Sequence, residues 1–104
     1  MKYNLSKDQI SEYHKNGYII IENVIDKEFL NELNNATDKM VKEATLIEKS
    51  NEQFDLGEKH SSTRPSVRRI KQPQNFDDIF KKLLFFPSIL EKVTSLLGKN
   101  FRLH

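Results

Sequence analysis

Four stretches of the chain carry hydrophobic residues at the three- and four-residue spacing of an amphipathic helix. In the longest of them, Phe29, Leu33 and Met40 share one side, and charged residues occupy the other. Ser6 precedes the first stretch as a favourable N-cap, and Gly17 follows it as a C-terminal stop. The pattern predicts helices at about residues 7–15, 27–49, 76–85 and 88–97.

Three shorter stretches have the composition of β-strands. Tyr18 to Ile21 is a run of β-branched and aromatic residues that is apolar on both faces, as in a covered strand. Val67 to Lys71 alternates apolar and basic residues, which is typical of a half-buried strand. A third strand signal begins at Phe101, so we predict strands at about residues 18–22, 67–71 and 100–104. Residues 50–66 are rich in turn-forming residues and are expected to form a loop.

These elements predict a single α+β segment that covers residues 1–104, without internal repeats or low-complexity tracts. The strand signal at Phe101 has no continuation after His104. We therefore expect the sequence to be part of a longer protein. The alternative is a small protein with a short terminal strand at the edge of a sheet.

The composition narrows the class of partner. The chain is 37% hydrophobic and 31% charged, and its 104 residues are enough for one small domain. The 17 basic and 15 acidic residues leave a net charge of +2, too weak a bias to indicate nucleic-acid binding. The N-terminus is polar, and the longest apolar run is far shorter than a membrane span. We expect a cytoplasmic protein with no nucleic-acid partner and no membrane partner.

Several kinds of catalytic site are missing from the sequence. The chain has no cysteine and no G-x-S-x-G motif, and its three glycines are too isolated to form a phosphate-binding loop. Its histidines, His14, His60 and His104, form neither H-x-D/E nor H-x-x-x-H. We therefore expect no catalytic residue and no complete metal site in these residues. The simpler interpretations are a helix-boundary His14, a solvated His60 and a strand residue at His104.

One cluster of positive charge remains, formed by Arg64, Arg68, Arg69 and Lys71. On a regular strand, Arg68 and Arg69 point to opposite faces, so that one would face solvent and the other a covered side. A covered arginine needs a carboxylate or phosphate partner. In order of preference, the cluster is a solvated strand edge with an internal salt bridge, an anion site, or a nucleic-acid contact.

The order of motifs resembles the N-terminal part of the phytanoyl-CoA dioxygenase family of iron(II)- and 2-oxoglutarate-dependent oxygenases. The opening combines a helix with Asn16-Gly17-Tyr18 and a hydrophobic run, and the chain closes with the pattern L-L-G-x-N-F-R-L-H. The resemblance spans nearly the whole chain. It is carried by Leu5–Ile10, Tyr13–Ile25, Arg68–Ile70, Phe76–Phe80, Pro87–Val93 and Leu96–His104.

The resemblance implies the N-terminal helices and first strands of a double-stranded β-helix, a jelly-roll or cupin-like fold whose barrel is incomplete in this chain. In the family, the H-x-D iron ligands follow shortly after the position of His104. The distal histidine and the arginine that pairs with 2-oxoglutarate lie further on. Fe(II) and 2-oxoglutarate are thus implied for the full-length relative, with a small-molecule or acyl substrate. Neither is expected bound to this chain, and the isolated chain is expected to be inactive.

Arg69 is the single site residue that the resemblance carries over. In related members, a basic residue just before the hydrophobic residue of this strand reaches the cosubstrate, and Arg69 matches it by position. Two alternatives remain open. The chain is a small non-catalytic protein that binds a partner or self-associates through the open strand edge at Phe101–His104, or it is a degenerate remnant of the family.

Overall fold

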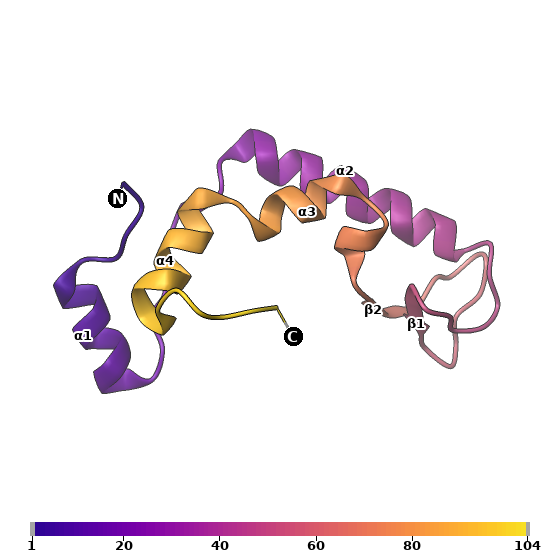
Figure 1. The fold of residues 1–104 in the computed structure, drawn as a ribbon. Coiled ribbons are helices and arrows are strands. Elements are labelled where there is room, and N and C mark those ends of the chain that lie inside the picture. Colours follow the sequence, from indigo (N-terminus) through magenta and orange to yellow (C-terminus); the bar gives the residue numbers. More distant parts are fainter. Residues whose placement is uncertain (1, 104) are drawn as a thin grey trace. The chain divides into compact units, whose positions relative to one another are not determined.

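The computed structural model describes residues 2–103, which contain helices and one antiparallel pair of strands, an α+β composition (Figure 1). The residues fall into two compact units. Unit 1 comprises the residues up to Asp26 and those from Leu84 onward, and unit 2 comprises Lys27–Leu83. In chain order the elements are α1 (Lys7–Asn16), α2 (Lys27–Ala44), β1 (Phe54–Leu56), β2 (Val67–Ile70), the 3-10 helix η1 (Pro73–Asn75), α3 (Asp78–Leu84) and α4 (Pro87–Leu97).

The start and end of α1 follow from its capping residues. The Ser6 hydroxyl accepts a hydrogen bond from the Gln9 backbone N–H at 3.1 Å, and the Gln9 side chain accepts one from the Ser6 N–H at 2.9 Å. This capping box satisfies two donors that a helix start leaves without partners. At the other end, Gly17 adopts the left-handed conformation with φ 81°, and its N–H donates to the Tyr13 carbonyl. The predicted first helix is confirmed.

Within unit 1, the segment before α1 is held on α4. The Tyr3 N–H donates to the Glu91 carboxylate at 2.8 Å, and the Lys92 ammonium donates to the Tyr3 carbonyl at 3.2 Å. The Leu5 N–H donates to the Ser95 hydroxyl at 3.3 Å, and the Leu5 side chain is buried. Backbone groups that have no secondary-structure partner are thus satisfied by side chains of one helix.

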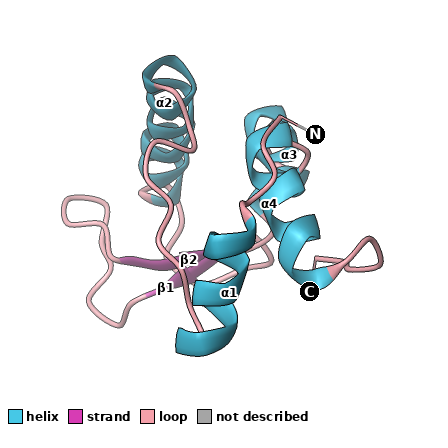
Figure 2. Cartoon of the chain, turned by 90° about the vertical axis from the view of Figure 1, so that its left-hand side faces the viewer, coloured by secondary structure: helices cyan, strands magenta, loops and turns pink. Residues whose placement is uncertain are grey.

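The core of unit 2 lies between α2 and the two strands (Figures 1 and 2). One face of α2 is buried at helical spacing, through Phe29, Leu33, Ala36, Met40 and Ala44. The last two of these residues form the central cluster with alternate residues of β1, Phe54 and Leu56. The partly buried side chains around this cluster are Ile47, Val67, Ile70 and Phe80.

The sequence does not predict β1, which lies inside the expected loop 50–66. Asn51 starts it, because its side-chain oxygen accepts the backbone N–H groups of Gln53 and Phe54 at 2.8 and 2.7 Å. Next to β1, the Gly57 N–H donates to the Ser66 carbonyl at 2.7 Å. A Cβ at Gly57 would overlap the Ser66 hydroxyl and lie 3.2 Å from the Ser66 Cβ, so the two segments approach closely and any larger residue here would force the Ser66 side chain to shift.

Two of the three predicted strands are wrong for the described residues. Residues 18–22 form no strand, because the only ladder within 2–103 joins β1 to β2. Tyr18 and Ile20 are therefore 63% and 79% exposed, where a covered strand was expected. Residues 100–103 are likewise without regular structure, and His104 lies outside the described residues. The predicted strand at 67–71 is confirmed as β2.

The helix boundaries differ from prediction at two places. The second helix ends at Ala44 instead of Lys49, because the Ala44 carbonyl bonds the Ile47 N–H at 3.3 Å and the His60 ring at 2.8 Å, and so does not extend the α-helical ladder. The third helix starts at Asp78 instead of Phe76, because η1 comes first and the Asp77 carboxylate then accepts the Ile79 N–H at 3.0 Å. The fourth predicted helix is confirmed as α4.

Candidate functional site

The basic residues of β2 lie at an irregularity of the strand pairing. Phe54 pairs with Ile70 and Asp55 with Arg69, but Leu56 pairs with Val67. Arg68 is thus an extra residue on β2, and two residues of this strand face one of β1. Such a β-bulge bends its strand and redirects side chains.

The bulge brings both arginines to one carboxylate. The Arg69 Nε donates to Asp55 Oδ2 at 3.0 Å, and the Arg68 Nη2 lies 3.4 Å from Asp55 Oδ1. The Arg68 Nη2 also donates to the Leu56 carbonyl at 2.9 Å. Asp55 is therefore the internal partner of both guanidinium groups. The internal salt bridge that the sequence offered as one interpretation of this cluster is therefore present.

The expectation that one arginine is covered is wrong. The side chains of Arg68 and Arg69 are 61% and 70% exposed, whereas that of Asp55 is 23% exposed. The alternation rule fails because it assumes a regular strand, and the bulge interrupts the alternation at Arg68. Each guanidinium keeps donors that make no hydrogen bond among residues 2–103, namely both Nη groups of Arg69, and Nη1 and Nε of Arg68.

The two other basic residues are not part of this pair. Arg64 is an exposed turn residue whose N–H donates to the Ser61 hydroxyl at 3.1 Å. Lys71 is half-buried, and its N–H donates to the Gln53 carbonyl at 2.7 Å. In the described part of the chain, neither side chain forms an ion pair. Of the four predicted residues, only Arg68 and Arg69 thus share a partner, Asp55. Arg64 and Lys71 are neighbours of this pair in the sequence but do not contact Asp55 through an ion pair within residues 2–103.

His60 is not the solvated residue that the sequence predicts. Its Nδ1 accepts the Ser66 backbone N–H at 2.9 Å, and its Nε2 lies 2.8 Å from the Ala44 carbonyl oxygen. A backbone N–H can only donate, so Nδ1 carries no proton, and Nε2 holds the proton that it donates to Ala44. The half-buried imidazole therefore joins the end of α2 to the segment that enters β2. No local sequence signal identifies this role, because both partners are backbone groups.

The described residues contain no metal centre. Among residues 2–103, no group of three or more His, Cys, Asp or Glu residues could hold a metal ion. His14 is exposed on α1 and packs edge-on against Tyr13, with 5.5 Å between the ring centroids. His104 is not among the described residues.

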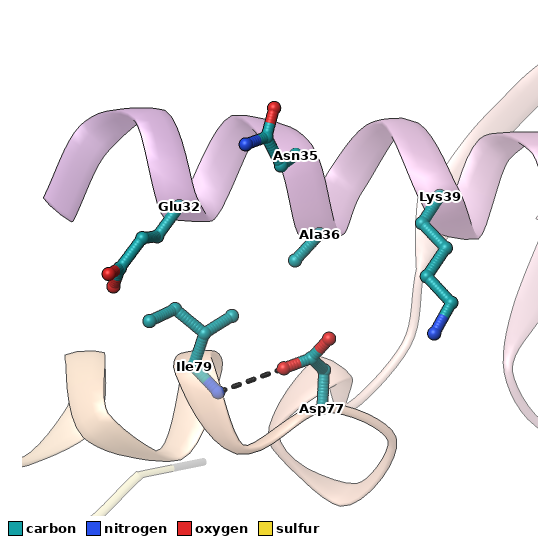
Figure 3. Close-up of a pocket in the computed structure, with 6 residues that line it drawn as sticks. All are labelled: Glu32, Asn35, Ala36, Lys39, Asp77 and Ile79. Atoms are coloured by element: carbon teal, nitrogen blue, oxygen red, sulfur yellow. Dashed lines mark hydrogen bonds between the residues drawn. The ribbon is translucent and has the colours of Figure 1, made fainter. Parts of the chain in front are cut away.

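A shallow groove of about 350 Å³ lies in unit 2 between α2 and the start of α3 (Figure 3). Glu32, Asn35, Ala36 and Lys39 line it from α2, with Asp77 and Ile79 opposite. The Asp77 carboxylate is engaged by the Ile79 N–H across the end of the groove. The charged side chains that line the groove carry both signs, and none forms an ion pair within residues 2–103. The groove therefore shows no preference for one chemical class of ligand.

No family model, curated protein or solved structure matches this chain. In the part of the chain that is described, every helix is too short or too polar to cross a membrane. We take the arginine pair with Asp55 as the candidate site, because it combines a net positive charge with N–H donors that make no hydrogen bond among residues 2–103.

Proposed function

We propose that this chain is the N-terminal part of a non-haem Fe(II)- and 2-oxoglutarate-dependent dioxygenase, a cytoplasmic hydroxylase of a small-molecule or acyl substrate. The observation that carries the proposal is the resemblance to the phytanoyl-CoA dioxygenase family, which runs from Leu5 to His104. Enzymes of this kind use iron and 2-oxoglutarate to hydroxylate an unactivated carbon with dioxygen. This chain would contribute the outer helices and first strands of the double-stranded β-helix.

The exposure pattern of the segment after α1 supports the proposal. Residues 18–21 have no helical or turn structure and alternate in exposure. Ile19 and Ile21 are half-buried, whereas Tyr18 and Ile20 are exposed. Tyr18 and Ile20 therefore expose apolar surface directly after α1, which the rest of the proposed enzyme would cover.

The two cofactors of the proposed enzyme fit the described residues differently. Iron does not fit, because no ligand set is present in residues 2–103. Its ligands would therefore come from other parts of the enzyme. 2-Oxoglutarate fits better, because the two Nη groups of Arg69 form a planar fork that matches a carboxylate. In the proposal, Arg69 binds a cosubstrate carboxylate while Asp55 holds its Nε.

We expect the isolated 104-residue chain to release no succinate from 2-oxoglutarate and to bind no stoichiometric iron, because its described residues, 2–103, contain no ligand set. The product of the native gene, expressed from its complete reading frame, is expected to do both. Iron content and succinate release are measured on both proteins under the same conditions. Turnover by the 104-residue chain, or no 2-oxoglutarate turnover by the native product, would contradict the proposal.

A second candidate function is a non-catalytic protein that binds a partner, either as a complete small protein or as a degenerate remnant of the family. The observation that favours it is the set of exposed large apolar side chains in unit 1, which include Tyr18, Ile20, Phe85, Leu97 and Leu103. The same experiment separates the two candidates, since a binding protein has no 2-oxoglutarate turnover in any form.

A further inference from the structure

We propose that the β1–β2 hairpin carries a site for a doubly charged oxyanion, formed by Arg68 and Arg69, in which Asp55 is a built-in competitor for the anion. The inference shares Arg69 with the proposed function and rests on it only if the anion is 2-oxoglutarate. Nothing in the geometry restricts the site to that molecule. The chemistry common to the ligands is a compact dianion with several acceptor oxygens.

The bulge creates the site. On a regular strand the two neighbouring arginines would diverge, but here both approach the same carboxylate, at 3.4 and 3.0 Å. The Arg68 guanidinium is further fixed by its hydrogen bond to the Leu56 carbonyl. Two guanidinium groups are therefore held around one point, which a single negative charge occupies.

The two guanidinium groups carry more positive charge and more N–H donors than the Asp55 carboxylate neutralises and binds. Two positive charges face one carboxylate, so the cluster of three side chains keeps a net charge of +1. Within residues 2–103, hydrogen bonds engage one nitrogen of each guanidinium. Guanidinium groups bind phosphate and carboxylate through pairs of parallel N–H donors. The exposed Nη groups of Arg69, with Nη1 of Arg68, can form such pairs with an incoming anion.

Asp55 limits the affinity of the site without closing it. Its carboxylate lies where an anion would make its best contacts with both arginines, so it competes with the anion and repels it. Ion pairs with exposed arginines are weak. A dianion can therefore displace the carboxylate or bind beside it. Removal of the Asp55 charge should strengthen anion binding more than removal of a nearby charge that contacts neither arginine.

The test is a titration of the isotope-labelled 104-residue chain with inorganic phosphate at constant ionic strength, followed on the arginine Nε–H resonances. The wild-type chain is expected to bind phosphate weakly, and Asp55→Asn to bind it about three- to tenfold more tightly. The matched control is Glu52→Gln, since Glu52 is exposed in the preceding loop and forms no ion pair within residues 2–103. It makes the same change in net charge and should leave the affinity within about twofold of wild type.

Two further variants keep the test decisive if Asp55→Asn fails to fold. Arg68→Gln and Arg69→Gln alter exposed side chains outside the core, and each is expected to weaken phosphate binding by about fivefold or more. A parallel titration with 2-oxoglutarate distinguishes a dicarboxylate from a phosphate group as the preferred ligand. Equal affinities in Asp55→Asn and Glu52→Gln, or phosphate binding that survives both arginine substitutions, would overturn the inference. Because phosphate binding requires neither iron nor turnover, its failure is distinct from a failure of the oxygenase proposal.

Discussion

Replacement of Leu56 by alanine is expected to destabilise unit 2 by about 2–5 kcal/mol. Leu56 is only 5% exposed and contacts the central cluster around Met40, Ala44 and Phe54. The substitution removes apolar surface from the core and leaves a cavity, because the surrounding structure relaxes only in part after such a change. A loss of this size approaches the total stability of a small domain, so urea unfolding monitored by circular dichroism should show a large shift of the midpoint.

Leu46→Ala is the matched control for this prediction. It makes the same chemical change in the turn after α2, at a side chain that is 84% exposed. Little apolar surface leaves the core there, and the free energy of unfolding should change by no more than about 0.5 kcal/mol. Equal shifts for the two variants would mean that β1 does not pack on α2 as described.

His60→Ala is expected to destabilise unit 2 by about 1–3 kcal/mol. The substitution removes two hydrogen bonds, to the Ala44 carbonyl and from the Ser66 N–H. It leaves the Ser66 N–H without its partner, whereas the Ala44 carbonyl keeps the Ile47 N–H at 3.3 Å. Hydrogen exchange should show the effect directly, because the Ser66 amide is expected to lose protection along with the segment between the strands.

His14→Ala provides the control, since this histidine is exposed on α1 and its side chain makes only a ring contact, with Tyr13, among residues 2–103. Its effect on the free energy of unfolding should stay within about 0.5 kcal/mol. The nitrogen chemical shifts of the wild-type imidazoles provide a second check, because His60 should be the Nε2–H tautomer. An Nδ1–H tautomer at His60, or similar losses of stability in both variants, would contradict the described role.

The parts of the fold that sequence predicts are those with local causes. Helix α1 has its capping residues on both sides, and α2 shows its buried face as a periodic pattern. The strand β1 lacks such a signal, since its three residues stand among turn formers and are ordered by Asn51 and by the core. Tyr18 to Ile21 has the composition of a strand but no pairing partner among residues 2–103, and composition alone does not supply one.

The candidate site likewise has some features that the sequence reveals and others that depend on the tertiary structure. The basic residues of β2 are evident from the sequence, and so is the requirement of an arginine for an anionic partner. That Asp55 is the partner of both arginines follows only from the bulge, which depends on how β2 registers against a strand that the sequence does not reveal. The role of His60 is not evident from the sequence for a similar reason. Its partner is the backbone carbonyl of Ala44, which lies 16 residues earlier in the chain.

We propose that these residues form the N-terminal part of a 2-oxoglutarate-dependent oxygenase. The measurement that tests it most directly is the sequence of the native gene across and beyond the codon for His104. We expect an open frame that soon encodes H-x-D, and further on a second histidine and an arginine for 2-oxoglutarate. A stop codon directly after His104, or a continuing frame without these residues, would contradict it.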